Sequence, residues 1–291
     1  MNKMILGSAQ FGMDYGVSNK IGKISNQEIR NIFHFSQQNY IDTIDTAMSY
    51  GNSEHLIGIY NKNLQVITKL PPMPSKCKDV EGWFSNEINQ SLERLRLKNL
   101  YGILLHNPDD LLGKNGLKLS NLLTSYKKKG IVKKIGLSIY DFSFIHRYLD
   151  VIKVDIVQCP FNIIDQRVIN TGLANEMHDI GIEIHARSIF LQGLLLMAEH
   201  ERPKYFQKWS SLWSKYDVFL DSNNITSIQA CIDFVLSNKL IDKFVVGIDS
   251  LRHLKEIVEL TKHSSKNINP NYNNLSSNDS SLINPSLWSL D

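Results

Sequence analysis

The chain has 291 residues, with 32 basic and 29 acidic side chains and a formal net charge of +3. This length fits one large domain or two small ones, and near-neutral charge without a long Lys/Arg block argues against a nucleic-acid-binding surface. The three cysteines are scattered, no N-terminal apolar leader is evident, and the most apolar run, residues 189–198, is too short to cross a bilayer. We therefore expect a reduced, cytoplasmic protein.

Short runs rich in β-branched residues predict strands, and longer stretches with a period of 3.6 residues predict helices. Strands are predicted at residues 4–7, 40–45, 64–69, 100–106, 134–139, 155–161, 182–188 and 243–248. Helices are predicted from about residue 26, after the capping box 25–28, and from residue 52, and then at 82–95, 117–129, 141–148, 167–180, 226–238 and 250–262.

This strict alternation predicts an α/β fold with parallel strands, and eight units match a (β/α)8 TIM barrel. An open doubly wound sheet is the alternative, but it needs a glycine-rich phosphate loop, which GSAQFG (residues 7–12) resembles only faintly. We treat residues 1–291 as a single barrel domain. Residues 263–291 form a C-terminal extension that is rich in Ser and Asn, yet LINPSLW (282–288) is too apolar for a free end. We expect it to dock on the barrel through Trp288.

Polar residues stand at the predicted carboxyl ends of nearly all strands, which is where barrel enzymes build their sites. Singly, each has a structural explanation; an Asp after a strand, for example, is usually a helix cap. Together, Asp45, Lys69 and His106 on adjacent strands, with Tyr50 in a loop, favour a functional site. The strand ends carry Gly7, Asp45, Lys69, His106, Ser138, Gln158, Asn162, Arg187, Ser188, Gly247 and Asp249.

Three motifs carry a resemblance to a known family. They are DTAMSYGNSE (45–54), a lysine at the end of the next strand, and LLHNPDD (104–110). In addition, the segment INPSLW (283–288) is similar to the C-terminal segments of bacterial members of the same family. Together they resemble the aldo-keto reductase family over the whole barrel. The resemblance implies a barrel that binds NADPH, or NADH in some members, and reduces carbonyl compounds without a metal.

Carbonyl reduction needs a hydride, which the cofactor supplies, and a proton, which the protein supplies. Tyr50 is expected to be the general acid, although its ordinary pKa of about 10 is high for this role. We expect Lys69 to lower the pKa of Tyr50, and Asp45 to pair with Lys69 and offset the cost of its burial. A neutral His106 is expected to donate a hydrogen bond to the carbonyl and orient the substrate.

The resemblance assigns the nicotinamide carboxamide to Ser138 and Gln158, which offer a donor and an acceptor. After strand seven, the family usually has an aromatic residue that stacks on the nicotinamide, followed by Ser. This sequence has Arg187 and then Ser188, and it has Ile139 where many members have Asn. A guanidinium can also stack, but the change leaves the cofactor geometry and the substrate's charge open.

The family's phosphate-binding segment corresponds to VGIDSLRHLKEI, residues 246–257. The backbone donors of Ser250 and Leu251 suit a pyrophosphate at a helix N-terminus. Arg252 or His253 could contact a 2′-phosphate, which would favour NADPH. An Asp249 side chain that points into the site would argue against NADPH. Arg252 is equally well explained as a solvated residue on the helix surface. The predicted cofactor site also includes Gly7, Gly247 and Glu256, the last beside the adenine by family position.

The substrate is expected to be a small carbonyl compound, with Asn162 and Arg187 indicating a polar or anionic one. A sugar or sugar derivative is favoured, and a pyridoxal-like aldehyde is the alternative. The residues predicted to line its pocket are Phe11, Tyr15, Phe161, Asn162, Phe190, Trp209 and Trp213. The two Trp residues are at least as well explained by core packing under the long loop after strand seven.

Two rival functions remain open. One is a cofactor-binding regulatory barrel with vestigial turnover, which would have little need of all four catalytic residues. The other is a lyase or isomerase that uses Lys69 as a Schiff base, which pairing with Asp45 would disfavour. No metal spacing is present, no membrane or nucleic-acid partner is indicated, and a monomer is assumed by default.

Overall fold

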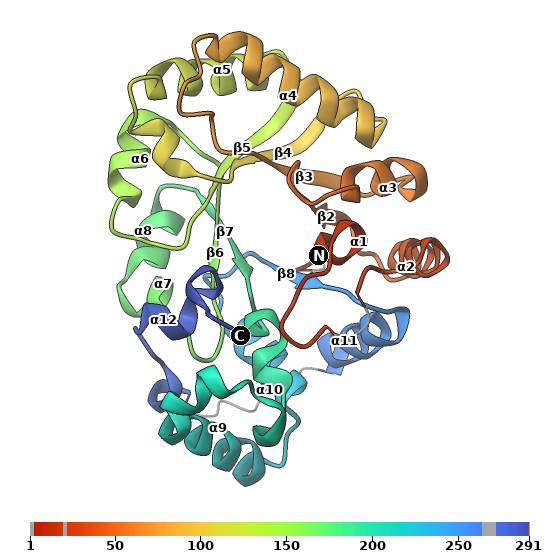
Figure 1. Cartoon of the computed structure of the whole chain (residues 1–291), viewed down its shortest axis with the longest axis vertical. Helices are drawn as coiled ribbons and strands as arrows, with labels where there is room; N and C mark the ends of the chain where they lie inside the picture. Colours follow the sequence, from red (N-terminus) through yellow and green to blue (C-terminus); the bar gives the residue numbers. More distant parts are fainter. Residues whose placement is uncertain (1–2, 20–21, 264–271, 291) are drawn as a thin grey trace.

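The computed structural model describes residues 3–19, 22–263 and 272–290. Within these residues, eight parallel strands form a closed barrel in chain order, and β8 pairs back with β1 (Figure 1). The predicted (β/α)8 TIM barrel is therefore confirmed, and the open doubly wound sheet is wrong. The strands are β1 (Met4–Gly7), β2 (Thr43–Asp45), β3 (Gln65–Leu70), β4 (Leu100–Leu105), β5 (Val132–Ser138), β6 (Ile156–Pro160), β7 (Glu183–Arg187) and β8 (Lys243–Gly247).

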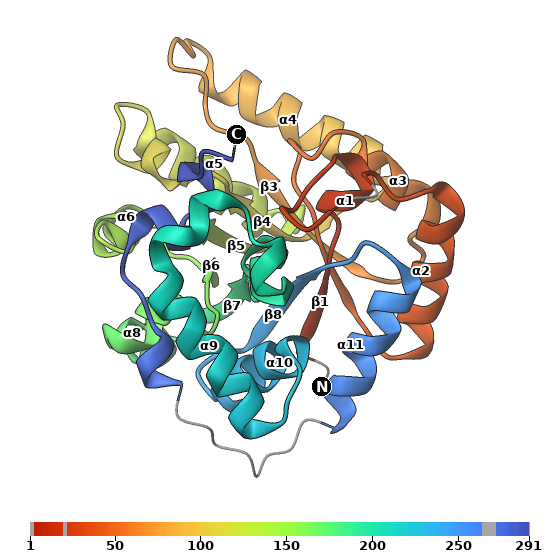
Figure 2. The same ribbon diagram turned by 60° about the horizontal axis from the view of Figure 1, so that its bottom comes forward.

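Helices surround the barrel, as the two views in Figures 1 and 2 show. The predicted start of α2 is confirmed, because the Ser25 hydroxyl accepts a hydrogen bond from the Glu28 N–H. The helices are α1 (Ala9–Gly12), α2 (Asn26–Gln38), α3 (Ser53–Tyr60), α4 (Val80–Leu95), α5 (Gly116–Lys128), α6 (Ile145–Val151), α7 (Arg167–Asn170), α8 (Leu173–Asp179), α9 (Ser210–Asn223), α10 (Ser227–Ser237), α11 (Leu251–His263) and α12 (Ser280–Ile283), with 3-10 turns at Pro108–Leu111, Leu191–Leu196, Glu199–Glu201, Lys204–Trp209, Asn273–Leu275 and Pro285–Leu287.

Several elements differ from the predicted ones, including the helix predicted at 141–148, which spans Ile145–Val151 (α6). The second strand starts at Thr43, because Tyr40 takes a left-handed conformation (φ 57°) and is exposed. The helix predicted at 167–180 is split into α7 and α8 by Gly172, whose φ of 82° interrupts it. Helix α9 lies in the segment after β7 for which no helix was predicted.

The core has two layers. A small cluster of fully buried side chains lies inside the barrel, and the larger layer lies between the strands and the helices. The inner cluster sits below the carboxyl ends of the strands and thus forms a floor beneath any site at the barrel mouth. It consists of Ile5, Ile67, Leu104 and Ile156.

The described part of the C-terminal extension packs against the barrel. Leu282 and Ile283 are fully buried, and the Ser277 N–H donates to the Ile164 carbonyl at 2.8 Å. The Trp288 ring lies edge-on to Phe206 at 4.9 Å between centroids. We propose that this extension is an integral part of the barrel domain; residues 264–271 lie outside the described residues.

We predict that Trp288→Ala lowers the free energy of unfolding by about 2 kcal/mol, because a half-buried indole loses part of its packing. Urea unfolding would measure the change. Leu290→Ala is the control, because Leu290 lies in the same segment and is 42% exposed. Equal effects of the two substitutions would contradict docking through Trp288.

Candidate active site

A pocket opens at the carboxyl ends of the strands and encloses about 1110 Å³, part of it open to solvent. Its floor follows from strand geometry, because residues two apart on a strand point to the same side. The residues two positions beyond the inner hydrophobic cluster therefore also lie on the interior side of the barrel. These are Gly7, Lys69, His106 and Gln158, and all four line the pocket.

Asp45 and Lys69 form a buried ion pair at the base of the pocket. Lys69 Nζ lies 2.5 Å from Asp45 Oδ2 and donates a second hydrogen bond to the Thr46 carbonyl at 3.0 Å. The other carboxylate oxygen of Asp45 accepts from Gln158 Nε2 at 2.8 Å. With both side chains almost fully buried, this pair is held in one geometry.

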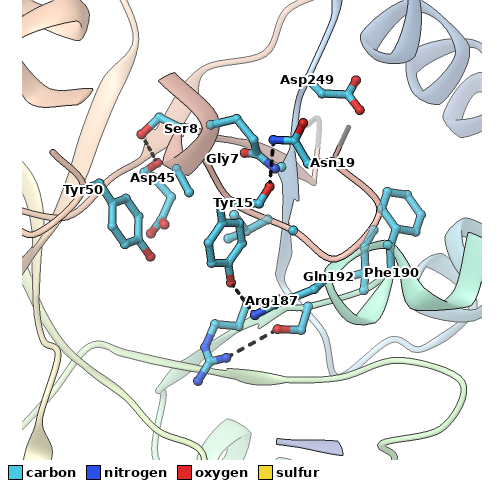
Figure 3. Close-up of a pocket in the computed structure, with 18 of the residues that line it drawn as sticks. Gly7, Ser8, Tyr15, Asn19, Asp45, Tyr50, Arg187, Phe190, Gln192 and Asp249 are labelled. Carbon is cyan, nitrogen blue, oxygen red and sulfur yellow. Dashed lines mark hydrogen bonds between the residues drawn. The ribbon is translucent and has the colours of Figure 1, made fainter. Parts of the chain in front are cut away.

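Tyr50 and His106 stand beside this ion pair. Lys69 Nζ lies 5.3 Å from the centre of the Tyr50 ring, and the rings of Tyr50 and His106 meet edge-on at 6.1 Å. Figure 3 shows Tyr50 directed into the same cavity as Tyr15 and Arg187. The structure thus brings the four predicted catalytic residues together at one end of the pocket.

Close backbone packing fixes the loop that carries Tyr50. A Cβ on Gly12 would lie 1.9 Å from the Tyr50 carbonyl oxygen, and a Cβ on Gly51 would lie 2.4 Å from the Gly12 oxygen. Gly51 also has a φ of 53°, which favours glycine. These contacts hold the loop after β2 against α1 and so fix the backbone of Tyr50.

The Ser-Glu part of the motif, Ser53 and Glu54, is structural. Ser53 Oγ donates to Ser8 in the loop after β1, with 2.8 Å to its hydroxyl and 3.0 Å to its carbonyl. The buried Glu54 carboxylate accepts from Thr68 and Ser91 at 2.7 Å each and pairs with Arg94. The motif therefore ties α3 to its neighbours beneath the Tyr50 loop.

The surroundings of Tyr50 in this structure favour its protonated form. Burial, followed by the Asp45 charge, raises the pKa of Tyr50, and the cation that opposes this is Arg187. Burial also lowers the pKa of Lys69, although Asp45 opposes the change. Tyr50 is therefore protonated at neutral pH, as a proton donor must be, and its acidification by Lys69 stays a prediction.

His106 is neutral at physiological pH. Burial, and then the charges of Lys69 and Arg187, lower the pKa of His106 to about 4. Its Nδ1 lies 3.4 Å from the Ser49 hydroxyl, and the neutral ring can donate one hydrogen bond. This agrees with the expected neutral state.

We predict that His106 destabilises the fold in mild acid. Its pKa is lower in the folded chain than its ordinary 6.5, so the unfolded chain binds more protons between these values. The free energy of unfolding therefore falls as the pH falls from about 6.5 towards 4. In urea unfolding at several pH values, His106→Asn should remove part of this fall, whereas substitution of the exposed His34 should not. An unchanged pH profile for His106→Asn would contradict the shift.

Ser138 and Gln158 are adjacent in the barrel. They are direct partners in the register of β5 and β6, and both line the pocket. Gln158 Oε1 is buried without a hydrogen-bond partner. A buried orphan acceptor is costly unless a ligand supplies a donor, so this pair fits the amide group of a nicotinamide.

Arg187 leaves β7 and lies flat against Tyr140. Its guanidinium carbon is 3.6 Å from the centre of the Tyr140 ring, and Nη2 donates to the Ile139 carbonyl at 3.0 Å. Its Nε is buried without a partner. Arg187, which replaces the aromatic residue usual in the family, is thus stacked on the ring of Tyr140. Tyr140 was not predicted as a site residue.

The loops after β1 and β7 meet over the pocket. Gln192 Nε2 lies 3.3 Å from the Tyr15 hydroxyl, and its carbonyl accepts from the Val17 N–H at 3.0 Å. Ser188, Leu191 and Gln192 all have positive φ values near 50°, which shapes the second loop. The sequence predicted Tyr15, Ser188 and Phe190 in this part of the pocket, but other lining residues were missed. For these, the one sequence feature that could have indicated a tight loop is the Gln-Gly pair in FLQG (190–193). Among those missed are Ser18, Asn19, Tyr140, Gln192 and Gly193.

Several residues predicted to line the substrate pocket, Trp209 and Trp213 among them, do not line it. Phe11 is buried against Phe33 with 6.0 Å between ring centres, and Phe161 stacks on Phe234 at 4.8 Å. The Asn162 side chain is fully buried and donates to the Ser188 carbonyl at 3.0 Å. These side chains support the loops, and none of them lines the pocket.

The start of α11 is more acidic than expected. Asp249 lines the pocket at the opposite end from Tyr50 (Figure 3), and its Oδ1 is 3.1 Å from both His253 Nδ1 and Ser250 Oγ. The Leu251 N–H, a predicted pyrophosphate donor, instead donates to Glu28 Oε1 at 2.5 Å. Three residues predicted to contact the cofactor do not line the pocket. Ser250 caps α11, because its hydroxyl accepts a hydrogen bond from the His253 N–H, and the side chains of Arg252 and Glu256 are exposed.

Other kinds of site are not evident in the described part of the chain. No group of three or more His, Cys, Asp or Glu side chains there could hold a metal ion. None of the helices in those residues combines the length and apolar composition that crossing a membrane requires.

Comparison with known proteins identifies the family. The structure resembles aldo-keto reductase AKR11C1 from Bacillus halodurans in its holo form (TM-score 0.70, 16% identity, 89% of this chain and 86% of that chain). It also resembles the thermostable aldo-keto reductase Tm1743 in complex with the inhibitor epalrestat (TM-score 0.67, 18% identity, 90% of each chain). We found no match among curated proteins. The aldo/keto reductase family model matches residues 3–269, so the chain belongs to this family of NAD(P)-dependent oxidoreductases.

Proposed function

We propose that the protein reduces an aldehyde or ketone to an alcohol with a nicotinamide dinucleotide. The observation that carries this proposal is the meeting of Asp45, Tyr50, Lys69 and His106 at one end of a pocket. When bound, the dinucleotide would supply the hydride. The orphan acceptor of Gln158, with Ser138 beside it, would hold the amide of the nicotinamide.

The four side chains would divide the remaining work. Tyr50, protonated at neutral pH, would give its proton to the carbonyl oxygen as negative charge develops there. Neutral His106 would donate a hydrogen bond to the same oxygen and orient it. The Lys69–Asp45 pair would provide the positive end of a fixed dipole beside the phenol.

The charges at α11 support NADH as the nucleotide, whereas sequence reasoning favoured NADPH. Arg252, the best candidate for a 2′-phosphate, is exposed and outside the pocket, and His253 is bonded to Asp249. The carboxylates of Asp249 and Glu28 would repel a doubly charged phosphate, whereas a carboxylate accepts hydrogen bonds from ribose hydroxyls. Titration with NADH and NADPH would test this preference, and tighter binding of NADPH would contradict it.

The substrate is proposed to be a small polar carbonyl compound, with a sugar or sugar derivative favoured. Hydroxyl, amide and guanidinium groups of Tyr15, Gln192 and Arg187 support a polar ligand. Oxidation of NADH and NADPH would be followed with aldehydes, ketones, 2-oxo acids and reducing sugars, and the alcohol product identified. Tight nucleotide binding without turnover on any of them would favour a regulatory barrel instead.

Schiff-base chemistry at Lys69 is the second candidate, because burial lowers the pKa of this amine. Borohydride trapping with each carbonyl compound would test it. A stable adduct at Lys69 would favour a lyase or isomerase. We expect no adduct, because Asp45 and the Thr46 carbonyl both hold the ammonium form.

A further inference from the structure

The Arg187 guanidinium crosses the mouth of the barrel beside the candidate nicotinamide site. Arg187 belongs to β7, yet its Nη2 bonds to the carbonyl of Ile139, which directly follows β5. Strand β6 lies between those strands in the barrel, so the side chain spans it. The guanidinium therefore lies next to Ser138 and above Gln158, the pair that fits the nicotinamide amide.

No carboxylate among the described residues lies within ion-pair distance of Arg187. The other cation at this end of the pocket, Lys69, is paired with Asp45, and His106 is neutral. The contacts of Arg187 are a carbonyl, the Ser188 hydroxyl at 3.4 Å and the face of Tyr140. Its positive charge is thus not compensated by any ion pair in the described part of the chain.

We propose that Arg187 makes the site selective for the reduced form of the nicotinamide, and this rests on the proposed reductase function. The oxidised ring carries a positive charge that the reduced ring lacks. A fixed, partly buried cation beside that ring repels the oxidised form and leaves the neutral form unaffected. Arg187 is then a specificity-determining residue that favours loading with reduced cofactor and release of oxidised cofactor.

Calorimetric titration of the full-length protein with NADH and NAD⁺ tests this proposal without any turnover. The unsubstituted protein is expected to bind NADH at least about 10-fold more tightly than NAD⁺, given the strength of like-charge repulsion in a partly buried site. Arg187→Met should reduce this ratio by about 10-fold, mainly through tighter binding of NAD⁺. Arg187→Lys, which keeps the charge, should preserve it.

Each other result has a definite meaning. If the ratio is the same in Arg187→Met and in the unsubstituted protein, the proposal is overturned while the reductase function stands. The same holds if Arg187→Met only raises KM for anionic carbonyl compounds, since Arg187 would then bind substrate. If the unsubstituted protein binds neither of these nucleotides and also fails to bind NADPH and NADP⁺, the reductase function itself is overturned. Arg187→Gln, which keeps a donor for the Ile139 carbonyl, replaces Arg187→Met if the latter fails to fold by circular dichroism.

Discussion

Tyr50→Phe should lower kcat by at least about 1,000-fold on whichever carbonyl substrate proves best, because it removes the proton donor. The ring and its edge-on contact with His106 remain, so the pocket keeps its shape. Nucleotide affinity should change by no more than about threefold, since the phenol oxygen acts on the substrate carbonyl. Steady-state kinetics and nucleotide titration of the same preparation would measure both quantities.

Tyr15→Phe is the matched control for this substitution. Tyr15 lines the same pocket, and burial raises the pKa of its phenol as it does for Tyr50. However, its hydroxyl is bonded to Gln192 in the loop after β7. We expect it to affect KM more than kcat. Full activity of Tyr50→Phe, or equal losses of kcat in both variants, would refute the role given to Tyr50.

The second large effect is expected in stability, at the Asp45–Lys69 pair. Lys69→Met leaves a buried carboxylate with Gln158 as its remaining side-chain donor, and Asp45→Asn leaves a buried ammonium without its counter-ion. Each single substitution should lower the free energy of unfolding by about 3–5 kcal/mol, because an unpaired buried charge is costly. The double variant should be more stable than either single variant.

The Lys127–Asp155 pair is the control for burial, since its side chains are 38% and 30% exposed. Lys127→Met should change the free energy of unfolding by no more than about 1 kcal/mol. Urea unfolding of the four variants would give all the values. Additive losses in the double variant would show that Asp45 and Lys69 do not depend on each other.

Much of the fold could be predicted from the sequence, because parallel barrel strands are short, apolar and evenly separated by helices. The position of Lys69 followed from the same pattern: it lies two residues beyond Ile67, which points into the barrel. The loop position of Tyr50 could be predicted only with its motif. The glycines and Ser53 that hold that loop act through contacts with the segment after β1, which residue spacing does not reveal.

The remaining parts of the site depend on tertiary contacts between distant segments. Glu28 caps α11 from 223 residues away, so the loss of a predicted phosphate donor could not be read from either segment alone. Phe11 and Phe161 were predicted to line the pocket, but their rings pack against Phe33 of α2 and Phe234 of α10 instead. The Tyr140 stack of Arg187 depends on where two strands end relative to each other.

The backbone-to-backbone contact between Gly12 and the Tyr50–Gly51 peptide has a consequence for engineering this barrel. Neither glycine tolerates a side chain, and each is held in place by the other's loop. A designer who exchanges the segment after β2 for that of another barrel would therefore have to transplant residues 9–12 with it. The range of substrates should be easier to alter through the long segment after β7. This segment is joined to the loop after β1 mainly by the contacts of Gln192.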